Sequence, residues 1–148
     1  MIGFIGLGIR SKPKAMSLIK AGYKLIVYDK LAILDELLSM GAEGAVSNKD
    51  VALKSNIIIT MLPNLSQVKE AILGTGGVIE GLKNGSIVVD MSSVSPDLSR
   101  ELAATIKTKN ASFLDGTTGV TASKDKAVLE IIEPILSVMG VPFVHSPK

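Results

Sequence analysis

The 148-residue chain has no cysteine and no tryptophan, and only 3% of its residues are aromatic. Without cysteine it forms neither disulfides nor thiolate metal sites, which fits a reducing compartment. The basic residues form no run and few aromatics accompany them, so the features of a nucleic-acid surface are missing. No apolar run approaches the ~20 residues of a membrane span. We therefore expect a cytoplasmic protein without nucleic-acid or membrane partners and without a metal, an organellar leader being the alternative.

The apolar residues that are present suit one particular kind of core. They make up 47% of the chain, and the formal net charge is only +2. With so few aromatics, the core must consist of aliphatic side chains and methionine. That composition is typical of a buried parallel sheet between helices, whose strands appear as continuous apolar runs. The length fits one domain over residues 1–148.

Strands and helices alternate along the chain. We expect strands at 2–5, 24–28, 44–46, 55–62, 86–90, 111–115 and 142–145. We expect helices at 13–21, 31–40, 48–53, 66–73, 95–106 and 125–139. Pro134 should kink or interrupt the last helix, because proline has no N–H and crowds the preceding turn. This rhythm predicts an α/β fold with a doubly wound parallel sheet.

The glycine turn at the start of the chain is the first candidate site. The apolar strand 2–5 ends at Gly6 and Gly8, and a helix follows. Such a turn brings backbone N–H groups close to a pyrophosphate at the helix N-terminus. The third glycine of the G-x-G-x-x-G pattern is replaced by Ser11. An ordinary strand-to-helix turn is the alternative interpretation.

Asp29 favours the dinucleotide interpretation. It ends the second strand about 20 residues after the glycines, where the pattern expects an acid that binds the adenosine ribose. A carboxylate there repels a 2′-phosphate, so NAD is favoured over NADP. Lys30 beside it would tolerate that phosphate, which keeps NADP open. A surface aspartate in a turn is the alternative.

Further candidates lie at other strand ends, because ligands of doubly wound sheets lie beyond the carboxyl ends of the strands. These ends nominate 62–64, 92–93 and 115–118. Each residue could equally cap a helix or form a turn, and capping is the favoured interpretation for Asn64 and Ser95.

The order of the motifs is similar to that of the β-hydroxyacid dehydrogenase family, which includes 3-hydroxyisobutyrate dehydrogenase and tartronate semialdehyde reductase and is related to 6-phosphogluconate dehydrogenase. The matching segments are GFIGLGI at 3–9, KP at 12–13, AGY at 21–23, VYD at 27–29, ITMLPN at 59–64, VDMSS at 89–93 and FLD at 113–115. The resemblance covers nearly the whole chain.

The resemblance implies a nicotinamide-dependent oxidation of a β-hydroxyacid, or reduction of a semialdehyde. By position it implies that the 6–9 turn, which is Gly6, Leu7, Gly8 and Ile9, faces the pyrophosphate and that Asp29 faces the ribose. Leu62 and Pro63 would border the cofactor through their backbone, and Ser93 would lie near the nicotinamide ribose. Arg10 stands where the family has methionine, and it could pair with a phosphate or obstruct the pocket.

The chain departs from the family after Asp115. The family continues A-P-V-S-G-G, whose serine and glycines hold the substrate carboxylate, whereas this chain has Gly-Thr-Thr-Gly. Thr117, Thr118 and Gly119 are therefore only weak substrate-binding candidates, and an internal deletion is expected around 119–125.

The family's catalytic lysine belongs to a helical second domain and to the pattern G-x-x-x-K-x-x-N. No lysine of this sequence lies in that pattern, so we assign no catalytic residue. We expect the chain to bind a dinucleotide and to be inactive alone. A small β-hydroxyacid would be a partner only with a second domain supplied, and a homo-oligomer is possible. The alternative is a non-catalytic module for nucleotide sensing or assembly.

Overall fold

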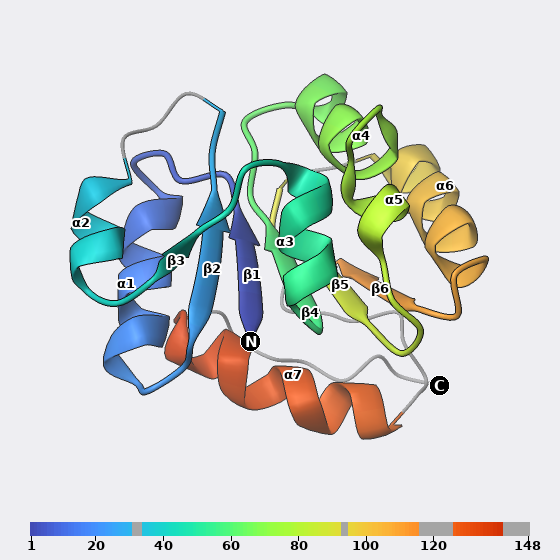
Figure 1. The fold of residues 1–148 in the computed structure, drawn as a ribbon. Coiled ribbons are helices and arrows are strands. Elements are labelled where there is room, and N and C mark those ends of the chain that lie inside the picture. The colour runs from blue at the N-terminus through green and yellow to red at the C-terminus, as the bar shows by residue number, and fades with distance from the viewer. Residues whose placement is uncertain (31–33, 93–94, 116–125, 141–148) are drawn as a thin grey trace.

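A computed structural model describes residues 1–30, 34–92, 95–115 and 126–140. In these ranges six strands form one parallel sheet in the order β3-β2-β1-β4-β5-β6 (Figure 1). The strands are β1 (Ile2–Ile5), β2 (Leu25–Tyr28), β3 (Glu43–Gly44), β4 (Ile57–Thr60), β5 (Ile87–Asp90) and β6 (Ser112–Asp115). This order is that of dinucleotide-binding Rossmann sheets, so the predicted doubly wound α/β fold is confirmed.

Apart from β1, the strands are shorter than predicted. The run predicted as a strand over 55–62 contributes only Ile57–Thr60. The predicted third strand, 44–46, is displaced to Glu43–Gly44. This edge strand is exposed and has no apolar alternation that would fix its limits. The strand predicted at 142–145 lies outside the described residues.

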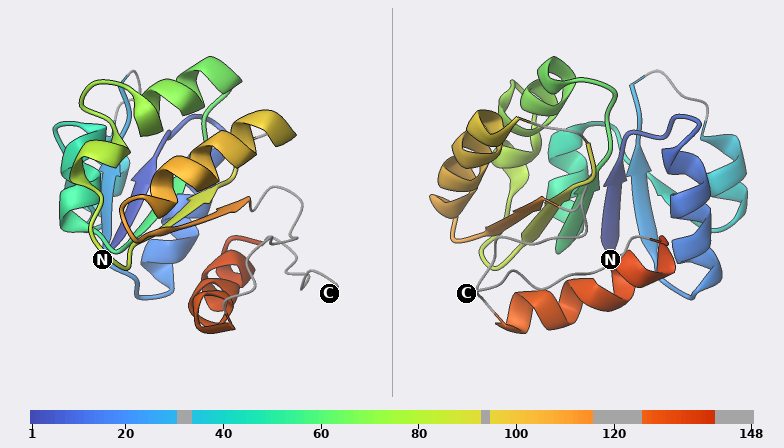
Figure 2. Two further views of the ribbon diagram at one scale, coloured as in Figure 1. Left: turned by 90° about the vertical axis from the view of Figure 1, so that its right-hand side faces the viewer. Right: turned by 180° about the vertical axis from the view of Figure 1, so that it is seen from behind.

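Helices cover both faces of the sheet. They are α1 (Ser11–Lys20), α2 (Asp35–Ser39), α3 (Asn48–Lys54), α4 (Leu65–Leu73), α5 (Val78–Gly81), α6 (Pro96–Lys107) and α7 (Lys126–Val138). Buried side chains of α1, α2 and α7 pack on one face. Those of α3, α4, α5 and α6 pack on the other. The left view of Figure 2 shows α6 and α7 on opposite sides of the sheet. The core is therefore two aliphatic layers separated by the sheet.

Side-chain caps fix the starts of three helices. Ser47 accepts from Asp50 N, Asn64 accepts from Gln67 N, and Ser95 accepts from Leu98 N. Capping by Asn64 and Ser95 is thus confirmed. The short helix α5 was not predicted, because four residues after a glycine-rich turn carry too little periodicity to detect.

Pro134 was predicted to kink or interrupt the last helix. The interruption is wrong, since α7 is continuous from Lys126 to Val138, and the kink stays a prediction. Proline offers no N–H at that position, but five buried aliphatic side chains hold the helix on the sheet. The Lys14 ammonium of α1 donates to the Met139 carbonyl at 3.0 Å, just beyond the end of α7. Tertiary contacts therefore outweigh the local cost of proline.

The parallel arrangement sets the place of the site. All strands point the same way, so the turns after β1, β2, β4 and β5 gather at the carboxyl edge of the sheet, at the top of Figure 1. Helix α7 crosses the opposite end, near the N-terminus. The carboxyl edge is where ligands of such sheets bind.

Candidate cofactor site at the carboxyl edge of the sheet

The turn after β1 requires glycine at its first position. Gly6 has φ +92°, a conformation that side chains rarely adopt. A Cβ on Gly6 would lie 2.1 Å from the Met61 carbonyl oxygen and 2.9 Å from Leu62 Cδ2. The turn therefore lies directly against the end of β4, and predicted residues 6 and 62 are brought into contact.

The same turn is tied to the end of β2. Gly6 N donates to the Tyr28 carbonyl at 3.1 Å, and Leu7 N donates to Asp29 Oδ2 at 2.5 Å. Leu7 is buried, whereas Asp29 is half-buried. The structure thus places the predicted acid at the glycine turn and shows what orients its carboxylate.

Beyond Leu7 the chain is open to solvent. Gly8, Ile9 and Arg10 are exposed, and the Ile9 side chain is 95% exposed. A Cβ on Gly8 would meet no atom within 4 Å. The backbone N–H groups of residues 9–11 donate to no atom of the described residues, and Arg10 provides no side-chain cap. These donors stand at the positive end of a ten-residue helix, which suits an anionic group.

Ser11 fits in place of the third glycine. It is 4% exposed, and its hydroxyl points towards the Met61 carbonyl at 3.5 Å, which is too long for a strong hydrogen bond. The tight approach expected of a glycine at this position is therefore achieved with a serine.

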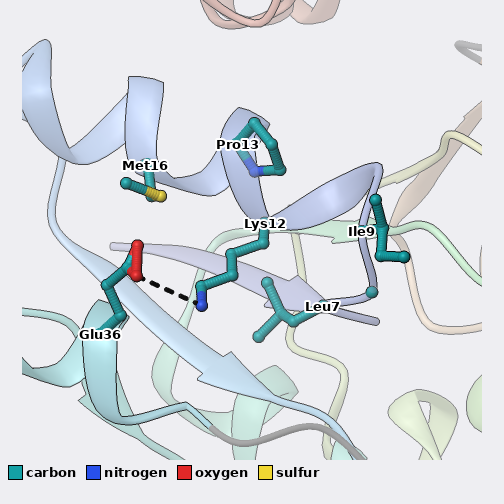
Figure 3. Close-up of a pocket in the computed structure, with 7 residues that line it drawn as sticks. Leu7, Ile9, Lys12, Pro13, Met16 and Glu36 are labelled. Carbon is teal, nitrogen blue, oxygen red and sulfur yellow. Dashed lines mark ion pairs between the residues drawn. The ribbon is translucent and has the colours of Figure 1, made fainter.

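A pocket of about 440 Å³ lies beside the turn, between α1 and α2 (Figure 3). Its lining residues are Leu7, Gly8, Ile9, Lys12, Pro13, Met16 and Glu36. The Lys12 ammonium lies 3.5 Å from the Glu36 carboxylate, with both side chains partly exposed. Such a pair is worth little to stability, so Lys12 is available to an incoming anion.

A second group of polar side chains lies where β4 and β5 end. Thr60 Oγ1 donates to Asp90 Oδ1 at 2.8 Å, and Ser92 N donates to the same oxygen at 3.2 Å. Leu62 N donates to Ser92 Oγ at 2.8 Å. We call Thr60, Asp90 and Ser92 the Asp90 cluster.

The electrostatics of the Asp90 cluster are unusual. Burial raises the pKa of Asp90 to about 6, opposed by hydrogen bonds from Thr60 and Ser92, and the Asp115 charge raises it further. Within the described part of the chain, Asp90 Oδ2 is buried without a hydrogen-bond partner. The sequence analysis included Asp90 only within the VDMSS segment and assigned it no role. The available signal was a charged residue that closes an apolar strand and precedes two serines.

The predicted residues fall into three groups. Gly6, Leu7, Gly8, Ile9 and Arg10 form one turn, and Asp29 is hydrogen-bonded to it through Leu7 N. Leu62 and Pro63 follow β4 beside it, Leu62 half-buried and Pro63 exposed. Ser93, Thr117, Thr118, Gly119 and the expected deletion around 119–125 lie outside the described residues.

No helix in the ranges that the structure describes combines the length and hydropathy needed to cross a bilayer.

The sheet order, the glycine turn and the acid at the end of β2 define a dinucleotide-binding domain of the Rossmann type. Residues 1–145 match the family described as the NAD binding domain of 6-phosphogluconate dehydrogenase. The chain belongs to this family of NAD-binding domains.

Two curated relatives agree with this assignment. The chain is 36% identical to 2-(hydroxymethyl)glutarate dehydrogenase of Eubacterium barkeri, over 97% of this chain and 52% of the relative. It is 41% identical to the mitochondrial 3-hydroxyisobutyrate dehydrogenase of Rattus norvegicus, over 77% of this chain and 34% of the relative. The chain thus spans about half of the first relative and about a third of the second. The likeness to 3-hydroxyisobutyrate dehydrogenase that the motifs predicted is confirmed.

A solved structure shows the same fold. "Psf3 in complex with NADP+ and 2-OPP" superposes with a TM-score of 0.87 at 19% identity, over the whole of this chain and 57% of that one.

Proposed function

We propose that the chain binds NAD(H) at the carboxyl edge of its sheet and serves hydride transfer between the nicotinamide and a β-hydroxyacid or its semialdehyde. The pyrophosphate lies on the glycine turn, from Gly6 to Arg10. The observation that carries the proposal is the set of free N–H groups of residues 9–11 at the start of α1, next to Asp29.

The residues present fit a dinucleotide. A Cβ on Gly8 would point into open space, so a phosphate can approach the backbone there. Helix α1 directs its positive end to that space. Leu62 and Pro63 border the same region from β4, and Ser93, by its position after β5, would serve the nicotinamide side. When bound, the nicotinamide supplies the hydride chemistry, and these residues of the chain orient it.

Asp29 sets the proposed preference for NAD over NADP. Its carboxylate is held by Leu7 N at the end of β2, where it would accept hydrogen bonds from the ribose hydroxyls. A 2′-phosphate would bring a second negative charge to the same point. Lys30 is exposed next to it and moderates the repulsion, so the preference is modest.

Thermal unfolding with each cofactor tests the proposal. At a cofactor concentration about 100-fold above Kd, binding adds about 2.7 kcal/mol of stability. We expect NADH to raise the melting temperature more than NADPH does. In Asp29→Asn the amide oxygen can still accept from Leu7 N, so the fold is kept while the NADH advantage shrinks. Equal melting temperatures with and without either cofactor at millimolar concentration would refute binding.

The substrate part of the proposal rests on the family likeness alone. Thr117, Thr118 and Gly119 are the proposed substrate-binding positions. No lysine of this chain lies in the family's catalytic pattern, so we propose that the chain by itself turns over no β-hydroxyacid. Steady turnover of 3-hydroxyisobutyrate by the pure chain would contradict this.

A non-catalytic role in nucleotide sensing or assembly is the second candidate. It is favoured by Gly119, which occupies the position of the family's substrate serine. The protein purified from its source separates the two roles. Turnover of a β-hydroxyacid by that material supports the enzyme, whereas tight NADH binding without turnover of any β-hydroxyacid supports the module.

A further inference from the structure

The Asp90 cluster occupies one row across the sheet. Thr60, Asp90 and Asp115 are register partners on β4, β5 and β6. Partners in a parallel sheet point to the same face, and here that face is covered by α4 and α6. Asp90 is fully buried and is the last residue of its strand. A carboxyl group is thereby fixed at the border between the core and the cofactor edge.

The cluster reaches the backbone of a cofactor-bordering residue through one side chain. Ser92 Oγ accepts from Leu62 N at 2.8 Å. Ser92 is itself bound to Asp90, because its N–H donates to Asp90 Oδ1 at 3.2 Å. Asp90 is therefore connected to Leu62 through Ser92, whose hydrogen bond with Leu62 spans 30 residues of sequence.

The surroundings of Asp90 make its burial costly. All the residues that α4 and α6 bury against the sheet are apolar: valine, alanine, leucine and isoleucine. Their charged residues pair with one another near solvent, Lys69 with Glu101 and Arg100 with Asp97. Asp115 adds a like charge from β6. No cation among the described residues forms an ion pair with Asp90, and Oδ2 has no partner.

An aliphatic residue at position 90 would avoid this cost, as Val88 and Val89 do on the same strand. It would also leave the Ser92 and Thr60 groups without their acceptor. The hydrogen bonds that Asp90 accepts from Thr60 and Ser92 therefore explain why a carboxyl group occupies this buried position. Leu62, whose N–H donates to Ser92, in turn contacts the Gly6 turn.

We propose that Asp90 is a positioning residue for the cofactor: through Ser92 it fixes the Leu62 backbone, and so holds the segment after β4 against the glycine turn. This inference rests on the proposed function for its effect on NADH, but the link between Asp90 and Leu62 stands on its own geometry.

Amide hydrogen exchange at Leu62 together with NADH affinity tests the link. In Ser92→Ala the Leu62 N–H loses its acceptor, and we expect its protection relative to Ile59 to fall at least tenfold, with about a tenfold weaker NADH affinity. Asp90→Ala should do the same. Asp90→Asn keeps an acceptor oxygen and should restore protection and affinity to within about threefold.

Ser86→Ala is the matched control. Ser86 is also a buried serine next to β5, but it lies at the opposite end and its Oγ has no hydrogen-bond partner. It should change neither Leu62 exchange nor NADH affinity. If Asp90→Ala does not fold, Ser92→Ala and Asp90→Asn still test whether Asp90 positions Leu62 through Ser92.

The outcomes separate the two proposals. Absence of NADH binding by the wild-type chain refutes the proposed function. Leu62 amide exchange in the variants still tests the connection from Asp90 through Ser92 to Leu62. Normal NADH binding and unchanged Leu62 exchange in Ser92→Ala would overturn the inference.

Discussion

The two halves of the sheet's carboxyl edge are built in different ways. At β1 and β2 the site consists of backbone N–H groups, two glycines and one acid, mostly open to solvent. At β4 and β5 it consists of buried hydroxyl and carboxyl side chains that bind one another. The first half presents donors for a ligand, whereas the second uses its polar groups to hold the chain in place.

This difference determines what mutations should do. On the open half, a side chain added to the backbone obstructs a ligand without harming the fold, except where the turn contacts β4. On the buried half, each change alters hydrogen bonds inside the protein first. Mutations on the open half should therefore change ligand affinity without changing stability, whereas mutations on the buried half should change both.

The largest expected effect is on stability, at the point where the two halves meet. Gly6→Ala would place a Cβ 2.1 Å from the Met61 carbonyl oxygen at φ +92°. The backbone conformation alone costs roughly 1–2 kcal/mol, and the clash adds to it, so we expect a loss of at least about 3 kcal/mol. Urea unfolding measures this loss. A loss below about 1 kcal/mol would mean that the turn does not contact β4 as described.

The pH dependence of stability tests the buried half. The pKa of Asp90 is about 6 in the folded protein, against 3.8 for an aspartate in an unfolded chain. Between these values the folded state binds more protons than the unfolded state, so the Asp90 contribution falls as pH rises, by up to about 3 kcal/mol. Asp90→Asn removes this loss. Its stability relative to wild type should rise from pH 4 to pH 7, and a constant difference would contradict a buried titrating carboxyl.

Gly8→Ala is the counterpart of Gly6→Ala on the open half. A Cβ there meets no atom within 4 Å, so stability should stay within about 1 kcal/mol of wild type. The new methyl group occupies the space proposed for the pyrophosphate. We expect NADH affinity to fall at least tenfold, measured by calorimetric titration. Unchanged affinity would place the phosphates elsewhere.

The cofactor preference of Asp29→Asn should change by a smaller factor. Removing the carboxylate charge favours the 2′-phosphate of NADPH, with Lys30 beside it. We expect the ratio of NADH to NADPH affinity to fall about three- to tenfold, as expected for loss of one partly exposed charge. Lys20→Ala, an exposed change at the far end of α1, should leave the ratio unaltered.

The smallest effect is expected far from the site. The Lys14 ammonium donates to the Met139 carbonyl and joins α1 to the end of α7. Lys14→Ala should cost about 1 kcal/mol of stability and leave NADH affinity unchanged. A change in affinity would show that the opposite edge of the sheet influences the site.

The open half could be predicted from the sequence because its information is local. Gly6 and Gly8 follow an apolar strand directly, and Asp29 stands at a characteristic distance from them. The buried half could not be predicted in the same way. Thr60, Asp90 and Ser92 come together only when β4 and β5 pair, and nothing in their own segments specifies that they bind one another.

The errors in the fold have similar causes. The limits of β3 were misplaced because an exposed two-residue strand has no apolar pattern. The continuity of α7 through Pro134 depends on contacts with the sheet, which local propensity does not include. The central strands and the helix caps were predicted because the apolar runs and the capping side chains lie within the segment itself.

We propose above that the N–H groups at the start of α1 receive the cofactor's pyrophosphate. Amide chemical shifts measured during a titration with NADH test it most directly. We predict that the amides of Ile9, Arg10 and Ser11 shift in a saturable manner and before other amides, and that Gly8→Ala suppresses these shifts. Saturable binding that leaves these three amides unmoved, or no binding at millimolar NADH, would contradict the account.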